Sequence, residues 1–318
     1  MNILFVIDRI ELKYFEFNDL VTNFWLIKEF LERNQTVCIT TIDKLGLEGG
    51  NPYAHCAKSY LKDGNIFYEK EFKKQDVQSF ELVMFRPDPP VDLDYINATY
   101  IFDFVDRSKT KVLNDTKAIR DFNEKLHAVW FNEFMPANIV TSSKHDIKEF
   151  LDEHNEIILK PLNRCFGSGV MYLNKTDKNI TSIINTMTNN ETTLVMVQKY
   201  ISAGVHGDKR VLILNGEVLD ECIVKLPPKD DFKFNTHSDE FIKKAVLSDS
   251  EKQKFTQVAK KLYSMGISMS GLDVIDEKII EVNVTSPCYF IKEINERFST
   301  QLEKKIVDKI LQNALTKV

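Results

Sequence analysis

Residues 271–287 read GLDVIDEKIIEVNVTSP, two short runs rich in Val and Ile joined by a polar Asp-Glu-Lys segment. Such runs predict the two strands of a hairpin. Residues two apart in a strand share a face, so Glu281 and Asn283 point the same way. A carboxylate within an apolar strand is costly unless a positive group meets it. These side chains therefore lie either on a solvated face or around a cation.

The connection between the two runs determines whether Asp273 joins that face. A three-residue connection over 276–278 places Asp273 opposite Glu281, whereas a two-residue turn sends Asp273 to the other face. With the longer connection, Asp273, Glu281 and Asn283 offer three oxygen donors that suit Mg²⁺. A half-solvated hairpin, in which such alternation is expected anyway, is the alternative.

A second candidate is Lys160, in the stretch EIILKPLNRCFGSGV over 156–170. A lysine that ends an apolar strand, before a loop with Gly167 and Gly169, can place an ammonium and backbone N–H groups around phosphate. The stretch is not a P-loop, because the lysine precedes the glycines and no Gly-Lys-Ser/Thr follows. The alternative is an ordinary surface lysine before a turn.

A third candidate lies in GDKRVLILNGEVLDECIVKL, residues 207–226. With Asn215–Gly216 as a two-residue turn, Arg210 begins one strand and Lys225 ends the next, at the same end of the hairpin. Two cations at one edge repel each other unless an anion lies there. Exposed charge at strand ends is the alternative.

Composition limits the class of protein. At 318 residues, with 43% hydrophobic and 28% charged residues, the chain is an ordinary globular one with more than one unit. The formal charge of −5 argues against a general nucleic-acid binder. Its apolar runs are too short for a membrane span, and Asp8 and Arg9 interrupt any signal peptide. Five scattered cysteines without a CxxC pair favour free thiols in a reducing cytoplasm.

The first third of the chain predicts an open α/β sheet. A strand over 1–8, a helix over 18–33 and a strand over 36–42 form a β-α-β unit, which favours parallel strands. The remaining elements alternate in the same way, with strands at 81–86 and 111–115 and a helix at 97–107.

The rest of the chain predicts two further groups of elements. A helix over 116–134, capped by Thr116, leads into helices at 144–154 and 177–188 and strands near 139, 156–160, 170–173 and 193–200. After residue 201 come strands at 209–216 and 217–226, a polar loop over 227–245, a helix at 249–264, the opening hairpin and a terminal helix.

Taken in order, these three candidates supply the parts of a nucleotide-dependent ligase. Over nearly its whole length the chain resembles the bacterial glutathione synthetases, which are ATP-grasp ligases. The matching stretches are FRPDPPVDLDYINATYIFD, RDFNEKL, IILKPL, GDKRVLILNGE and GLDVIDEKIIEVNVTSP. The resemblance implies an N-terminal open parallel-sheet α/β domain (1–122) followed by a two-lobed ATP-grasp fold. Its small lobe would span 123–200, and its C-terminal lobe, with the metal and substrate site, 201–318.

The resemblance also implies roles for individual residues. Nucleotide binding would fall to Lys125 and Lys160 at the phosphates, Gly167 and Gly169 in the covering loop, Gln198, Tyr200 and Ile201 at adenine, and Asp208 at the ribose. Arg210 would stabilise the transferred phosphoryl group, with Lys225 as a second catalytic cation. Mg²⁺, or Mn²⁺, would be bound by Asp273, Glu281 and Asn283, and the dipeptide by Asn235 and Ser286.

The implied reaction has two steps. ATP phosphorylates the C-terminal carboxylate of γ-glutamylcysteine, and the amine of glycine then attacks the acyl phosphate to give glutathione. The resemblance further implies a homotetramer that acts on small molecules, whereas composition predicts a cytoplasmic protein with no nucleic-acid or membrane partner.

Two loops depart from the family pattern. The family typically has KPLDGMGG where this chain has KPLNRCFGSG, and its Arg-Ile-Pro and Gly-rich segment correspond here to KLPPKDDFKFNTHSDEF, with Lys225 and Lys233. Lysine cannot reproduce bidentate guanidinium contacts. Two alternatives therefore stay open: a ligase of the same fold with another acceptor, resembling the glutamate ligases, and a nucleotide-binding protein with little turnover.

Overall fold

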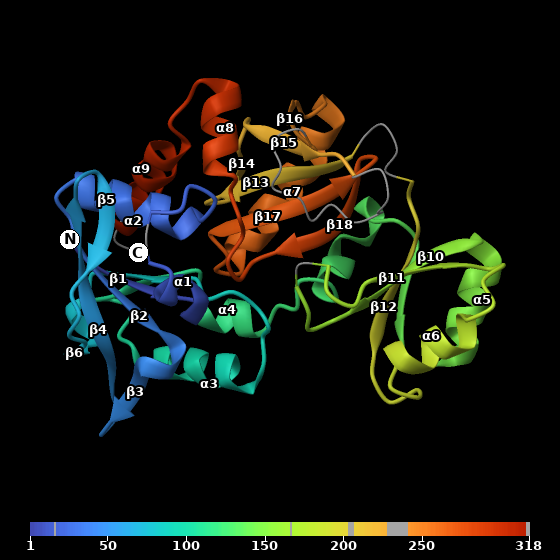
Figure 1. Cartoon of the computed structure of the whole chain (residues 1–318), viewed down its shortest axis with the longest axis horizontal. Helices are drawn as coiled ribbons and strands as arrows, with labels where there is room; N and C mark the ends of the chain where they lie inside the picture. Colours follow the sequence, from blue (N-terminus) through green and yellow to red (C-terminus); the bar gives the residue numbers. More distant parts are fainter. Residues whose placement is uncertain (16, 166, 203–206, 228–240, 316–318) are drawn as a thin grey trace.

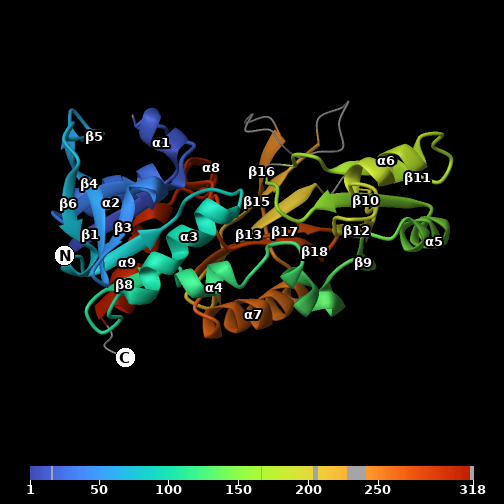
Figure 2. The same cartoon turned by 90° about the horizontal axis from the view of Figure 1, so that it is seen from below.

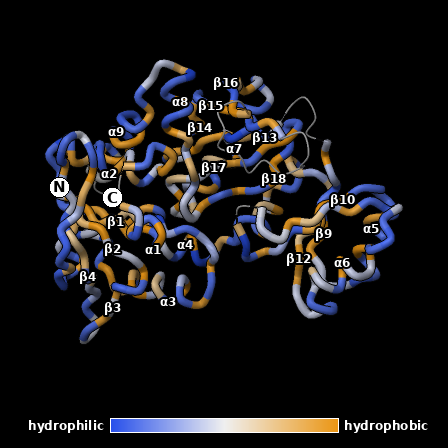
Figure 3. The backbone as a smooth tube through the Cα atoms, viewed as in Figure 1, coloured by the Kyte–Doolittle hydropathy of each residue, from blue (hydrophilic) through white to orange (hydrophobic). Residues whose placement is uncertain are grey.

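The computed structural model describes residues 1–15, 17–165, 167–202, 207–227 and 241–315. Three β-sheets follow one another along its longest axis (Figure 1). In Figure 3 the hydrophobic stretches run along the strands, and hydrophilic stretches mark the outer loops. Among the described helices, none has both the length and the apolar character needed to cross a bilayer.

The first sheet has a parallel centre. Strands β1 (Asn2–Ile7) and β2 (Thr36–Thr41) are joined through α2 (Thr22–Glu32), and β7 (Leu82–Phe85) and β8 (Lys111–Leu113) extend the parallel set. The predicted β-α-β unit is confirmed. The apolar run of β1 is buried on both faces, as expected for a parallel strand covered by helices.

Antiparallel strands widen this sheet beyond β2. The long strand β4 (Asn51–Lys62) pairs with β2 and carries β3 (Leu45–Glu48), β5 (Asn65–Tyr68) and β6 (Lys73–Asp76). The sequence analysis did not anticipate these four strands. Short helical segments complete the unit: α1 (Arg9–Lys13), η1 (Ile42–Lys44), η2 (Val77–Ser79), α3 (Leu93–Ile101) and η3 (Phe102–Phe104).

The predicted helix over 116–134 is wrong in its middle. It consists of α4 (Thr116–Arg120) and the 3₁₀ segment η4 (His127–Phe134), separated by irregular backbone. The N-cap is Asp115 rather than Thr116, because the Asp115 carboxylate accepts from the backbone N–H groups of Lys117 and Ala118. The break between α4 and η4 faces the cleft described below.

The second sheet, in the order β11-β10-β12-β9, is antiparallel. Side chains alternate across it: Ile157 and Leu159 of β10 join the core under the helices, whereas Ile158 and Lys160 point to the opposite face. That second face forms one wall of the cleft. The predicted elements are confirmed as β9 (Asn138–Thr141), α5 (Lys144–His154), β10 (Glu156–Pro161), β11 (Met171–Asn174), α6 (Ile180–Met187) and β12 (Val195–Lys199).

The third sheet is antiparallel and is covered by α7 (Asp249–Ser264), which confirms the helix predicted over 249–264. The predicted polar loop over 227–245 is wrong at its end, where residues 242–245 form a strand. The strands are β13 (Asp208–Leu214), β14 (Glu217–Val218), β15 (Cys222–Lys225), β16 (Ile242–Ala245), β17 (Met269–Ile275) and β18 (Lys278–Asn283).

The C-terminal segment returns to the first sheet. Two helices, α8 (Ile291–Phe298) and α9 (Leu302–Leu315), stand where one was predicted. Ile306 and Ile310 of α9 share a core with Ile3 of β1, and α9 lies against α2 (Figure 2). The first and third sheets are therefore held together by a common apolar core.

Candidate active site

A cavity of about 330 Å³ opens between the cleft faces of the second and third sheets. Most of the residues predicted for the site line it: Lys125, Lys160, Gly167, Gln198, Tyr200, Ile201, Asp208, Arg210, Lys225, Asp273, Glu281, Asn283 and Ser286. Gly169 lies in the loop above Pro161, and both loop glycines have positive φ. The predicted dipeptide residue Asn235 lies outside the described residues.

The hairpin β17–β18 brings the three predicted metal ligands onto one face by an unexpected route. Its turn has two residues, Asp276 and Glu277, both with positive φ, so the predicted three-residue connection is wrong. A β-bulge at Ile280 supplies the extra residue instead, and Asp273 pairs with Glu281 as predicted. The bulge thus corrects the register that the short turn would have reversed.

The half-buried side chains of Asp273, Glu281 and Asn283 form an oxygen cluster. Asn283 Nδ2 lies 3.4 Å from Asp273 Oδ2. Burial acts to raise the pKa of Asp273, but Arg210 and Lys225 outweigh it and hold the pKa below its ordinary value. Asp273 Oδ1 is buried without a hydrogen bond to a described residue, although Arg210 Nη2 lies 2.7 Å away. Asp273 and Glu281 supply carboxylate oxygens and Asn283 supplies an amide oxygen. These are hard oxygen donors of the kind that Mg²⁺ prefers.

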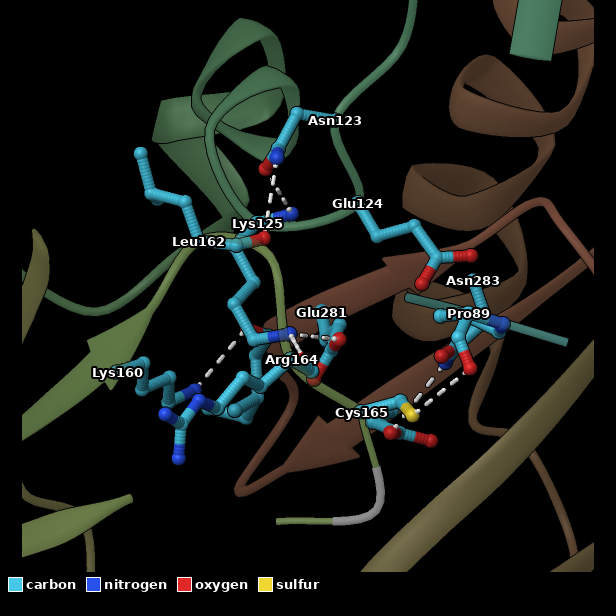
Figure 4. Close-up of polar contacts among 12 residues, drawn as sticks. Pro89, Asn123, Glu124, Lys125, Lys160, Leu162, Arg164, Cys165, Glu281 and Asn283 are labelled. Carbon is cyan, nitrogen blue, oxygen red and sulfur yellow. Dashed lines mark hydrogen bonds and ion pairs between the residues drawn. The ribbon is translucent and has the colours of Figure 1, made fainter. Parts of the chain in front are cut away.

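The break between α4 and η4 directs Lys125 into the cavity. Asn123 Oδ1 accepts from the backbone N–H groups of Lys125 and Leu126, which replaces the helical pattern there. Lys125 Nζ then donates to Glu281 Oε1 at 2.8 Å and to the Arg164 carbonyl oxygen at 2.6 Å (Figure 4). Burial disfavours the ammonium, but Glu281 outweighs it and raises the pKa of Lys125.

Lys160 approaches the same cluster from β10. Its side chain is buried, and Nζ donates to the carbonyl oxygen of Ile280 at 3.3 Å, the residue that forms the bulge. Among the described residues it has no ion pair with a carboxylate. Burial lowers the pKa of Lys160 from 10.5 to about 8.

Arg210 and Lys225 lie at one edge of the third sheet, as predicted, and each meets a carboxylate. The two-residue turn Asn215–Gly216 is confirmed, but the register shifts by two residues between β14 and β15. Lys225 therefore pairs with Asp208, with Nζ 2.7 Å from Oδ2, while Arg210 lies beside Asp273. The anions between the two cations are the protein's own.

One end of the cavity has the character of a site for an aromatic base. Gln198 lies opposite Ile158 in the second sheet, and its Nε2 is buried without a hydrogen-bond partner among the described residues. Tyr200 follows β12 and packs edge-on against Tyr172, with ring centroids 5.0 Å apart. An unsatisfied donor beside apolar and aromatic walls can hold a flat heteroaromatic ring.

Comparisons with known proteins agree with this geometry. Residues 1–120 match the family model "Prokaryotic glutathione synthetase, N-terminal domain", and residues 124–299 match "Prokaryotic glutathione synthetase, ATP-grasp domain". The glutathione synthetases of Vibrio parahaemolyticus and of Neisseria meningitidis serogroup B are each 33% identical to this protein. Each alignment covers 91% of this chain and 92% of the relative. The chain belongs to the prokaryotic glutathione synthetase family. Both the resemblance and the ligase class predicted from the sequence are confirmed.

Solved structures extend this result to the fold. D-cycloserine synthetase DcsG aligns with a TM-score of 0.67 over 99% of this chain and all of that chain, at 14% identity. D-alanyl-alanine synthetase A of Vibrio cholerae gives a TM-score of 0.62 at 13% identity, over 99% of this chain and 98% of that one. The ATP-grasp ligase PsnB, complexed with a minimal precursor, Mg and ADP, gives 0.61 at 15% identity, over 98% of each chain. The predicted ATP-grasp fold is confirmed.

Two acidic residues of the site were not found from the sequence. Glu124 is half-buried, and its carboxylate accepts from the backbone N–H groups of Val284 and Thr285, at 2.7 and 3.0 Å, and so fixes the segment that carries Ser286. Burial raises the pKa of Asp88, which hydrogen-bonds with Ser286. The available signals were the acids in NEK and PDPP. Glu124 was instead assigned to a continuous helix.

Proposed function

We propose that this chain joins γ-glutamylcysteine to glycine at the expense of ATP, with ADP, phosphate and glutathione as products. Family membership supports the reaction class. The cavity that carries Lys125, Lys160, Arg210 and the oxygen cluster is the observation that supports a phosphoryl-transfer site. In the first step the γ-phosphoryl group of ATP passes to the terminal carboxylate of the dipeptide. In the second, the amine of glycine displaces phosphate from the acyl phosphate and loses a proton.

The nucleotide would lie between the two cleft walls. Gln198, Tyr200 and Ile201 would border adenine, and Asp208 would accept from the ribose hydroxyls if Lys225 yields its contact. Lys125 and Lys160 would bind the phosphates, beneath the loop that contains Gly167 and Gly169. Buried ammonium groups suit this task because a bound phosphate restores the charge stabilisation that they lost when they were removed from water.

Arg210 would stabilise the charge that develops on the transferred phosphoryl group, with Lys225 beside it. Asp273, Glu281 and Asn283 would bind Mg²⁺, or Mn²⁺ in its place, which supplies charge neutralisation at the phosphates. The dipeptide would lie at Ser286, beside Asp88, and the assignment of Asn235 to the same substrate is part of this proposal.

The wider assignments belong to the same proposal. The chain would divide into an N-terminal domain (1–122), a small lobe (123–200) and a C-terminal lobe (201–318). It would act in the cytoplasm as a homotetramer on small molecules, without a nucleic-acid partner.

Product formation tests the proposal. Purified protein would receive ATP, Mg²⁺, γ-glutamylcysteine and glycine, and phosphate and glutathione would be measured separately. We expect both products in equal amounts, and their loss in a Glu281→Gln variant that keeps its fold by circular dichroism. Phosphate release only with a different acceptor would refute the glutathione assignment and support the glutamate-ligase-like alternative. ATP binding without release, whichever dipeptide is supplied, would refute both.

A further inference from the structure

Arg164 differs from the other arginines of the chain. Of eight arginines, seven form an ion pair or a side-chain hydrogen bond with the described part of the chain. The guanidinium of Arg164 forms neither with any described residue. Arg164 is exposed, and it lines the cavity between the second and third sheets. A guanidinium has five donors and is always charged, so a cavity position without a partner points to an anionic ligand.

The backbone that carries Arg164 is fixed by the same residues that shape the site. Asn123 Nδ2 donates to the Leu162 carbonyl oxygen at 3.0 Å, and Lys125 Nζ donates to the Arg164 carbonyl oxygen at 2.6 Å. The segment between α4 and η4, which directs Lys125 into the cavity, therefore also positions the loop that carries Arg164. Because Lys125 contacts both Glu281 and this loop, the Arg164 side chain begins next to the oxygen cluster.

Gly169 makes room for the side chain. A Cβ atom at Gly169 would lie 3.4 Å from Arg164 Nη1 and 3.1 Å from Pro161 Cγ, so the guanidinium packs closely over a position without a side chain. In Figure 4 the Arg164 side chain extends from the loop toward Lys160. Within the described part of the chain, neither cation is paired with a carboxylate. Lys125, Arg210 and Lys225 each are.

We propose that Arg164 binds the β- and γ-phosphates of the nucleotide, as a third cation beside Lys125 and Lys160. The planar guanidinium can give two parallel hydrogen bonds to phosphate oxygens, which backbone N–H groups of a glycine loop cannot do from one residue. This assignment rests on the proposed ATP-dependent function and adds a residue that the resemblance did not supply. AMP, which has neither phosphate, does not engage Arg164.

Binding of AMP, ADP and ATP, each with Mg²⁺, tests the assignment by isothermal titration calorimetry. Three variants are compared with the wild type: Arg164→Ala, Arg164→Lys and, as a matched control, Asn163→Ala at the exposed neighbouring position. We expect Arg164→Ala to weaken ADP and ATP about tenfold or more, and AMP less than about twofold. Arg164→Lys should recover part of the loss, and Asn163→Ala should match the wild type.

The outcomes separate this assignment from the proposed function. Equal weakening of AMP, ADP and ATP in Arg164→Ala would show a packing role and overturn the assignment, as would unchanged affinity for all three. In both cases the ligase proposal would stand. A wild-type protein that binds no ATP would overturn the ligase proposal itself, and the role of Arg164 with it.

Discussion

Replacing Lys160 with methionine should make the ligand-free protein more stable while it weakens ATP binding. Lys160 is 6% exposed, and the one hydrogen bond of its ammonium to a described residue is to the Ile280 carbonyl oxygen at 3.3 Å. Burial lowers its pKa from 10.5 to about 8. Methionine fills a similar volume without a charge.

The pKa shift gives the magnitude. A pKa lowered from 10.5 to about 8 corresponds to about 3 kcal/mol by which the charged Lys160 destabilises the folded state at pH 7. The folded-state pKa lies below the unfolded one, so this cost is complete below pH 8 and disappears as the pH rises from 8 to 10.5. Methionine cannot donate to the Ile280 carbonyl oxygen, and the loss of that hydrogen bond costs the variant about 1 kcal/mol. The variant should therefore gain about 2 kcal/mol at pH 7, and less than that at pH 9.5.

Thermal unfolding of the ligand-free protein at the two pH values measures this difference. We expect Lys160→Met to raise Tm by several degrees at pH 7 and by a smaller amount at pH 9.5. Lys148→Met, on the exposed face of α5, should change Tm little at either pH. In an ATP titration, Lys160→Met should bind about tenfold more weakly or worse. A lower Tm than the wild type at pH 7, or a gain independent of pH, would refute the reasoning.

Three further predictions follow from neighbouring groups. Glu124→Ala leaves the N–H groups of Val284 and Thr285 without an acceptor and should cost about 3 kcal/mol in chemical unfolding, against a smaller loss in Glu124→Gln. Gly207→Ala should lower Tm clearly, because φ is +67° and a Cβ would lie 2.5 Å from the Lys225 carbonyl oxygen. Gly64→Ala, at φ +78° in open space, should cost only about 1 kcal/mol. Between pH 7 and 9, ATP affinity by calorimetry should fall about tenfold as the Lys160 ammonium deprotonates, and a flat profile would contradict that pKa.

Local signals sufficed where an element's ends are set by its own residues. The helix predicted over 249–264 is found as α7 with the same bounds. Ser248 and Glu251 form a reciprocal capping box at its start, and Gly266 follows its end. The strand that ends in Lys160 was recognisable in the same way, from a short apolar run bounded by Pro161.

The errors arose where distant contacts override local pattern. Residues 116–134 have helical composition, but Asn123 bonds to the Leu162 carbonyl oxygen, 39 residues away, and interrupts the helix. The bulge at Ile280 satisfies its carbonyl oxygen through Lys160, which is 120 residues distant. Neither partner is visible from a window of sequence. The correct register of Asp273 was thus predicted from an incorrect turn, and only the assembled site explains it.

Three basic groups that line the cavity, Lys125, Arg210 and Lys225, are held by internal ion pairs. Lys125 meets Glu281 at 2.8 Å, and Arg210 lies 2.7 Å from Asp273. A cation that takes the two carboxylates frees the two basic groups for phosphate, so Mg²⁺ and ATP should each promote binding of the other. Such coupling is worth about 1–3 kcal/mol in typical cases and is reciprocal.

Glu281→Gln separates this coupling from the chelation of ATP by Mg²⁺ in solution, which is the same for every variant. The substitution removes the charge that holds Lys125, so ATP affinity without Mg²⁺ should be equal to that of the wild type or higher. The increase in affinity on adding Mg²⁺ should be about tenfold smaller than in the wild type. Calorimetric titrations of both proteins, with and without Mg²⁺, measure the two ratios. Equal ratios would mean that the Lys125–Glu281 pair persists when nucleotide binds, and the exchange of partners inferred from the geometry would be wrong.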